Sequence, residues 1–367
     1  MSLQLDSLVP GYIQKFEAYI PSKPDPELKK LYGCPRIFRL NNNENPLGPP
    51  PTSQEVIRKF EPYKASIYPS GDVYYLRYKL ADRFGFHPDQ FIVGNGANEV
   101  IAFVIKAFCQ EGDNIITADK TFAVYEWVAE FSGFQAQLVP LKDYTFDDEG
   151  MLARINDRTK ILFVCNPNNP TGTYWPVKKL RRFLDRIDGR QIVVVDEAYF
   201  EFLDKPDYPD GMKLIPEYPN LVVFRTFSKM YGLAGLRIGY LAGSLDVVDV
   251  IRRTCVVYSV NVVAQEAALA ALDDPEHIPR TRALINEEKD FVCRELDAMG
   301  IPYVRGEANF MMIKLPISDT LAYRKMMKKG VMIRSMSGFR YPNYIRLTLH
   351  RHEAMQAFVE ALGEIVS

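Results

Sequence analysis

Short runs of apolar and β-branched residues alternate with longer stretches of helical periodicity from about residue 90 onward. Runs such as Ile192–Val195 contain no polar residue, so a strand formed there is expected to be buried on both faces. Strands are expected at 91–93, 114–117, 136–139, 161–164, 191–195, 221–224 and 238–242. Helical stretches between them, such as 97–108 and 176–186, predict an α/β fold with a doubly wound, mostly parallel sheet.

The pattern changes after about residue 250. Helices are expected at 264–272, 279–299, 319–328 and the C-terminal end, with strands near 309–315, 331–334 and 344–349. This order predicts a smaller α+β unit, while the proline-rich and charged N-terminal stretch is typical of an arm. We therefore expect an N-terminal arm (1–35), a large α/β domain (36–252) and a small α+β domain (253–367).

Composition excludes several classes of protein. The 367 residues are 47% hydrophobic and 25% charged, which is ordinary for a globular enzyme. A formal net charge of -1 gives no reason to expect nucleic acid or an anionic membrane as a partner. No apolar run approaches the roughly 20 residues of a membrane helix. The five cysteines are widely spaced and no secretory signal is evident, which favours a cytoplasmic protein without a disulfide framework. Of the four histidines, His350 and His352 could bind a metal together, but they lack a third ligand nearby, so no metal site is expected.

The strongest chemical signal is Lys229, which follows a strand expected to be buried. Burial lowers the pKa of an ammonium, and a neutral amine can attack a carbonyl. Thr226 and Ser228 offer two hydroxyls beside it, and Arg237 offers a guanidinium, a set that suits a phosphate. An amine nucleophile beside a phosphate site is what pyridoxal 5′-phosphate requires. The alternative is an ordinary surface lysine in a loop.

A second phosphate-binding element is the turn Gly94–Glu99, which joins an expected strand to an expected helix. Free backbone N–H groups and the helix dipole at such a turn attract an anion. A dinucleotide fingerprint is the obvious rival, but its third glycine is absent. A Gly-Lys-Ser/Thr motif is absent too, so the turn does not favour a nucleotide.

Four further residues suit a planar, charged ring. Asp196 follows a buried strand, where a carboxylate needs a partner such as a protonated pyridine nitrogen. Tyr199 and Asn169 can reach the phenolic oxygen of the same ring, and Phe122 can stack on its face. Taken singly, each has a simpler explanation: a helix cap, a tight loop or core packing.

In their order and spacing, these motifs resemble the fold-type I pyridoxal-phosphate aminotransferases, and more closely the histidinol-phosphate aminotransferases. The resemblance covers about residues 19 to 350. It is carried by Leu40–Gly48 (LNNNENPLG), Ile67–Pro69 (IYP), Asn168–Gly172 (NNPTG), Asp196–Tyr199 (DEAY) and Thr226–Arg237 with its Ser-Lys pair and its Ala-Gly-Leu-Arg end.

The resemblance implies a role for each matching residue. Lys229 forms a covalent imine with the cofactor and moves a proton during the reaction, and Asp196 pairs with the pyridinium. Asn169 and Tyr199 contact the ring oxygen, and Phe122 stacks on the ring where tyrosine is frequent. The residues implied at the phosphate are Ala97, Asn98, Thr226, Ser228 and Arg237.

One implied contact crosses between subunits. Tyr68 would reach the phosphate of the neighbouring subunit's cofactor, so the resemblance implies a homodimer. Asn98 departs from the family pattern, because many relatives carry aspartate there. The backbone contacts at position 98 would be unaffected, whereas a side-chain role is not implied.

Substrate contacts are expected from two arginines and a tyrosine. Arg346 lies in a stretch whose apolar residues occupy the opposite face, and it matches the anion-binding arginine of aminotransferases. Arg334 and Tyr19 are further candidates. Together they suit a substrate phosphate. A solvated strand position is the alternative for each arginine.

The resemblance implies transamination between L-histidinol phosphate and 2-oxoglutarate, which yields imidazole-acetol phosphate and L-glutamate in histidine biosynthesis. An aromatic amino-acid aminotransferase and a threonine-phosphate decarboxylase are alternatives on the same fold. A non-catalytic regulator that binds pyridoxal phosphate is a third, but it would need an added DNA-binding module.

Overall fold

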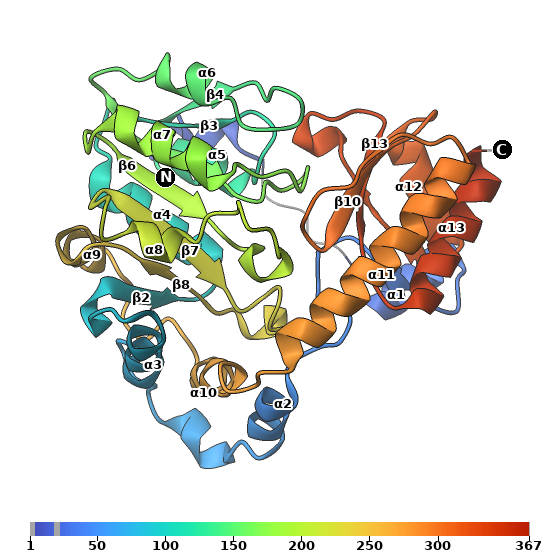
Figure 1. The fold of residues 1–367 in the computed structure, drawn as a ribbon, viewed down its shortest axis with the longest axis horizontal. Coiled ribbons are helices and arrows are strands. Elements are labelled where there is room, and N and C mark those ends of the chain that lie inside the picture. The colour runs from blue at the N-terminus through green and yellow to red at the C-terminus, as the bar shows by residue number, and fades with distance from the viewer. Residues whose placement is uncertain (1–3, 18–22, 367) are drawn as a thin grey trace.

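The structure, a computed structural model, describes residues 4–17 and 23–366. Its largest layer is a seven-stranded sheet with the strand order β2-β8-β7-β6-β5-β3-β4 (Figure 1). The strands are β2 (Phe91–Gly94), β3 (Asn114–Ala118), β4 (Gln135–Val139), β5 (Thr159–Cys165), β6 (Ile192–Asp196), β7 (Leu221–Thr226) and β8 (Gly239–Ala242). Strands β3, β5, β6 and β7 are almost wholly buried, as their unbroken apolar runs predict.

The expected α/β fold with a mostly parallel sheet is confirmed, with one exception in direction. Strand β8 runs antiparallel to both of its neighbours, β2 and β7. The connection from β7 to β8 contains one short 3₁₀ turn (Ala234–Leu236) and no crossover helix. A parallel return needs such a crossover, so the chain comes back antiparallel.

Helices pack on this sheet through apolar stripes. The helices of this part are α4 (Ala97–Phe108), α5 (Val124–Phe131), α6 (Asp148–Leu152), α7 (Val177–Ile187), α8 (Gly211–Leu214) and α9 (Leu245–Arg252). In α7 the buried residues are Leu180, Phe183, Leu184 and Ile187. Their spacing of three, one and three residues places them on one face of the helix, while the charged residues face outward.

The C-terminal part holds a second, antiparallel sheet in the order β12-β13-β10-β9. Its strands are β9 (Tyr303–Val304), β10 (Phe310–Lys314), β12 (Arg334–Ser335) and β13 (Tyr344–Thr348), and its helices are α11 (His277–Ala298), α12 (Asp319–Lys328) and α13 (His352–Val366). Figure 1 shows α11 crossing from the large sheet to this part. One strand was expected at 331–334, but the structure has two there. Strand β12 pairs with β13, whereas β11 (Val331–Met332) pairs with β1 (Phe38–Arg39).

The expected N-terminal arm contains a helix, α1 (Asp25–Tyr32), whose Leu28 packs against Met327 and Met332. Further helices are α2 (Pro51–Arg58), α3 (Tyr74–Phe84) and α10 (Val262–Ala271), and α10 packs against α2 and α3. The N-terminal segment thus contacts the C-terminal part, and a segment after residue 252 contacts α2 and α3. The domain bounds stay a prediction.

Candidate active site

A pocket of about 660 Å³ lies where β5, β6 and β7 end, between the two sheets. Carboxyl ends of parallel strands are the expected place for a ligand in an open α/β sheet. Sequence-predicted residues that line the pocket are Ala97, Asn98, Phe122, Asn169, Asp196, Tyr199, Thr226, Ser228, Lys229, Arg237, Arg334 and Arg346. Segments up to 304 residues apart in sequence (42 to 346) therefore meet around one cavity.

Lys229 lies just beyond the end of β7, and its Nζ donates a hydrogen bond to the carbonyl oxygen of Asn42 at 2.8 Å. Burial in the pocket lowers the pKa of Lys229 to about 8, and the cations Arg346 and Arg237 push it in the same direction. A larger share of this amine is therefore neutral near physiological pH than for a solvated lysine. Such an amine can act as a nucleophile or as a base.

Asp196, the last residue of β6, is buried at the pocket wall. It accepts hydrogen bonds from the hydroxyl of Tyr125 and from the backbone N–H of Ala198 at 3.0 Å. Burial raises the pKa of the Asp196 carboxyl, while the Tyr125 bond, the Ala198 bond and the nearby Lys229 charge oppose that shift. A cationic group in the pocket would stabilise the carboxylate.

Opposite these groups, the start of α4 forms a narrow cradle with Arg237. Gly96 has φ +82°, and a Cβ placed there would lie 2.4 Å from Nη2 of Arg237. Only glycine lets the guanidinium approach the helix start so closely. The N–H of Ser228 donates to Oγ1 of Thr226 at 3.0 Å, which orients this hydroxyl at the same end of the pocket. Hydroxyls, a guanidinium and free N–H groups suit a phosphate.

Asn169 and Tyr199 each use one polar atom within the protein and keep another for a ligand. Oδ1 of Asn169 accepts from Nη1 of Arg346 at 2.5 Å, which leaves the amide N–H groups as donors. The hydroxyl of Tyr199 accepts from Nδ2 of Asn43 at 2.8 Å and keeps its proton. Burial raises the pKa of Tyr199, so this hydroxyl stays a donor. Two donors beside one another suit an anionic ring oxygen.

Two guanidiniums from the antiparallel sheet form the remaining wall. Arg346 of β13 is buried, whereas Arg334, directly opposite it on β12, is exposed. Burial, with a smaller contribution from the charge of Arg334, lowers the pKa of Arg346 to about 10. Both guanidiniums lie near the ring of Phe339, at 5.9 and 5.7 Å from its centroid. Two adjacent cations at a cavity suit an anionic substrate group.

Comparison with known proteins shows which family has this architecture. A model of the family "aminotransferase class I and II" matches residues 35–362. A histidinol-phosphate aminotransferase from Caldicellulosiruptor saccharolyticus is 38% identical over 96% of this chain and 99% of its own. The chain belongs to the class I and II aminotransferases.

Further relatives of this aminotransferase agree in length and fold. A histidinol-phosphate aminotransferase from Anaeromyxobacter sp. is 36% identical over 98% of this chain and 99% of its own. The crystal structure of histidinol-phosphate aminotransferase from Clostridium acetobutylicum has a TM-score of 0.81 at 25% identity, covering 90% of this chain and 99% of that one. The Sinorhizobium meliloti enzyme, solved with pyridoxal 5′-phosphate, has a TM-score of 0.87 at 24% identity over 98% of both chains.

Several residues of the aminotransferase pocket are absent from the sequence-based expectations. The Leu40–Gly48 motif served only as a mark of resemblance, yet the backbone oxygens of Asn41 and Asn42 accept from Arg346 and Lys229. The run of three asparagines in this motif, which lacks apolar periodicity, was the sequence signal that could have indicated a loop at the pocket. Tyr125 carried no signal of its own, because its contact with Asp196 depends on how α5 packs over the sheet.

Tyr68 is an expected site residue that does not line the pocket of this aminotransferase chain. Tyr68 lies on the surface with 81% of its area exposed, and its ring lies 5.0 Å from that of Tyr258. Tyr19 lies outside the described residues.

Proposed function

We propose that this aminotransferase moves the amino group of L-histidinol phosphate to 2-oxoglutarate, giving imidazole-acetol phosphate and L-glutamate in histidine biosynthesis. The observation that carries the proposal is 38% identity over almost the full length of a histidinol-phosphate aminotransferase. The two adjacent guanidiniums of Arg334 and Arg346 support it, because both the phosphorylated substrate and glutamate are anionic.

The residues of the pocket fit pyridoxal 5′-phosphate as the cofactor. The buried Asp196 carboxyl would gain a cationic partner in the ring nitrogen, and the Gly96–Arg237 cradle is shaped for a phosphate. When bound, the cofactor supplies a ring that accepts electrons as the substrate loses its Cα proton. Lys229 is placed to take and return this proton, since burial lowers the pKa of its amine.

Asn169, Tyr199 and Phe122 would orient the ring in this proposal, with two hydrogen-bond donors at its edge and an aromatic face above it. The cofactor phosphate would lie against the hydroxyls of Thr226 and Ser228, Arg237 and the start of α4. Ala97 and Asn98 contribute backbone N–H groups there.

Arg346 and Arg334 would bind the distal anionic group of the substrate. Arg346 is held by Asn41 and Asn169, so it is fixed before substrate arrives, whereas exposed Arg334 can adjust. A pair of this kind can serve a phosphate in one half-reaction and a carboxylate in the other. Tyr19 is proposed as a third contact.

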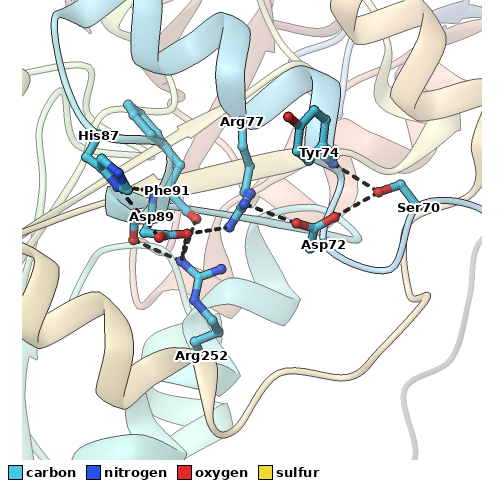
Figure 2. A network of polar contacts seen from close by, with 8 residues as sticks. All are labelled: Ser70, Asp72, Tyr74, Arg77, His87, Asp89, Phe91 and Arg252. Atoms are coloured by element: carbon cyan, nitrogen blue, oxygen red, sulfur yellow. Dashed lines mark hydrogen bonds and ion pairs between the residues drawn. The ribbon is translucent and has the colours of Figure 1, made fainter.

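We further propose a homodimer in which Tyr68 reaches the cofactor phosphate of the partner. Exposed apolar side chains lie near Tyr68 or the turn that follows it: Ile67, Val257 and Tyr258. Figure 2 shows the turn that follows Tyr68 held by buried Arg77, which pairs with Asp72 at 3.0 Å and Asp89 at 3.2 Å. A well-anchored turn that presents exposed aromatic residues supports a role at an interface.

The cytoplasm is the proposed location, and all five cysteines are free thiols, as expected in a reducing compartment. Within residues 4–17 and 23–366, no helix combines the length and apolarity of a membrane span.

Comparison of kcat/KM for three amino donors tests the proposed substrate. Histidinol phosphate is expected to exceed phenylalanine and threonine phosphate by a wide margin, with imidazole-acetol phosphate as product. A preference for phenylalanine would identify an aromatic aminotransferase instead. Release of carbon dioxide from threonine phosphate would identify a decarboxylase.

A further inference from the structure

A buried ion pair lies next to the proposed cofactor ligands without touching the pocket. Glu197 directly follows Asp196, and Arg225 directly precedes Thr226. Oε2 of Glu197 lies 2.7 Å from Nη2 and 2.9 Å from Nε of Arg225. Neither Glu197 nor Arg225 lines the pocket, whereas Asp196 and Thr226 do.

The pair is enclosed by further polar and aromatic contacts. The other oxygen of Glu197 accepts from the N–H of Gly211 at 2.7 Å, and Nη2 of Arg225 also reaches Oδ1 of Asp210 at 2.7 Å. The guanidinium stacks on the ring of Phe200, 3.6 Å from its centroid. The space beside Glu197 is so tight that a Cβ added to Gly211 would lie 2.7 Å from Oε1 of Glu197. The two side chains are thus held in one arrangement.

Strand geometry explains why the pair bears on the pocket. Strands β6 and β7 are parallel neighbours, with Asp196 opposite Phe224, and the N–H of Glu197 continues the ladder to the carbonyl of Phe224 at 2.9 Å. Successive side chains of a strand point to opposite faces. Asp196 and Thr226 therefore face the pocket, while Glu197 and Arg225 join the same two strand ends from the other face.

Burying an ion pair is costly, and apolar side chains of similar size often stabilise a fold as well or better. Glu197 is fully buried and Arg225 is 4% exposed. Burial raises the pKa of Glu197 to about 7, against the effect of Arg225. An ion pair of this kind is therefore poorly suited to general stabilisation of the fold. Because it lies where the two strands that carry proposed cofactor ligands end, it points to a role in positioning them.

We propose that Glu197 and Arg225 are positioning residues that fix the separation of Asp196 from Thr226, and so match the pocket to the length of pyridoxal 5′-phosphate from ring nitrogen to phosphate. This inference rests on the proposed cofactor placement. Neither residue touches the cofactor; they act through the strand ends that carry its ligands.

The test compares two ligands in the full-length chain freed of cofactor. Pyridoxal 5′-phosphate spans both strand ends, whereas inorganic phosphate occupies only the end at Thr226. Titration calorimetry measures both dissociation constants for Glu197→Gln and for a matched control, Glu288→Gln. Glu288 is also a buried glutamate, bonded to His352, but it lies on α11 away from the pocket.

In Glu197→Gln the Kd for pyridoxal 5′-phosphate is expected to rise about 10–100-fold, the range seen when groups that orient metal ligands are removed. The Kd for phosphate should change little, and both constants should stay near their original values in Glu288→Gln. An unchanged Kd for the cofactor, an equal loss for phosphate, or an equal loss in the control would each overturn the proposal.

Arg225→Lys provides a second variant in case Glu197→Gln does not fold. Lysine keeps the charge but cannot reproduce the two bonds to Glu197, so the same selective loss is expected. Unchanged cofactor affinity in this variant overturns the proposal as well. Failure of the proposed function has a different signature: the unaltered chain would not bind the cofactor, or Asp196→Asn would bind it normally.

Discussion

Arg346 and Asn169, 177 residues apart in the chain, share a buried hydrogen bond of 2.5 Å. The bond joins β13 of the antiparallel sheet to the turn after β5 of the large sheet. It therefore connects the proposed substrate-binding cation to the amide proposed to face the cofactor ring. In the proposed function, substrate binding and cofactor orientation would therefore share this contact.

This contact predicts that Arg346→Met and Asn169→Ala will not have additive effects. Residues that share a hydrogen bond typically show coupling of about 0.5–3 kcal/mol. Values of kcat/KM for histidinol phosphate in the two single variants and the double variant measure that coupling. Arg334→Met combined with Asn169→Ala is the control, because among the described residues Arg346 donates to Asn169 and Arg334 does not, and near-additive effects are expected there. Additivity in the Arg346 cycle would show that the bond has no functional role.

Asp196→Asn is expected to reduce turnover at least about a hundredfold, because removing one member of a buried ion pair costs about 3–5 kcal/mol. The asparagine keeps the volume of the side chain and loses the charge that would hold a proton on the ring nitrogen. Single-turnover kinetics with histidinol phosphate measure the effect. Tyr125→Phe, which removes only one hydrogen bond to the carboxylate, should have a smaller effect. Near-normal turnover in Asp196→Asn would refute the assigned role.

Gly96→Ala is expected to weaken binding of pyridoxal 5′-phosphate. Its backbone conformation costs a residue with a side chain about 1–3 kcal/mol, and the new Cβ would displace Arg237 from the cradle. Gly235→Ala is a matched control, since a Cβ at that position meets nothing within 4 Å. Equilibrium titration of the cofactor-free variants measures both affinities. Equal affinities for the two variants would mean that the cradle does not hold the phosphate.

The proposed homodimer predicts that two inactive variants restore one another. A Lys229→Ala chain keeps Tyr68, and a Tyr68→Ala chain keeps Lys229, so a mixed dimer contains one complete site. Subunit exchange at equal amounts should return about a quarter of the original sites, as expected for random pairing in a twofold dimer. Specific activity after exchange measures this recovery. No recovery, despite mixed dimers detected by native mass spectrometry, would place Tyr68 outside the partner's site.

Much of the fold was predictable because buried parallel strands carry unbroken apolar runs. Strands β6 and β7 were expected within one or two residues at each end, and that alone located Asp196 and Lys229 at one edge of the sheet. The direction of β8 was not predictable from its apolar residues. It follows from the lack of a crossover helix after Lys229, which a hydrophobic pattern does not report.

The chemistry of single side chains was predictable only where the residue type was distinctive. The lysine, the aspartate and the arginines could be recognised as candidates, whereas Tyr125 and Phe339 look like ordinary core aromatics in the sequence. Phe339 lines the pocket and Tyr125 bonds to Asp196 at the pocket wall, and both placements depend on contacts between distant segments. The backbone oxygens of Asn41 and Asn42 are a further example, because every residue has such a group and only the fold selects two of them.

The central claim is that Lys229 is the amine that binds the cofactor covalently, and borohydride reduction followed by peptide mass analysis tests it most directly. Lys289 provides an internal comparison, because burial lowers its pKa to about 8 as well, but it donates to the carbonyl of Gly306 at 3.0 Å and does not line the pocket. We predict that the reduced pyridoxyl phosphate is found on Lys229 alone. A label on Lys289 or on another lysine, or no label on a chain that binds the cofactor, would contradict the account.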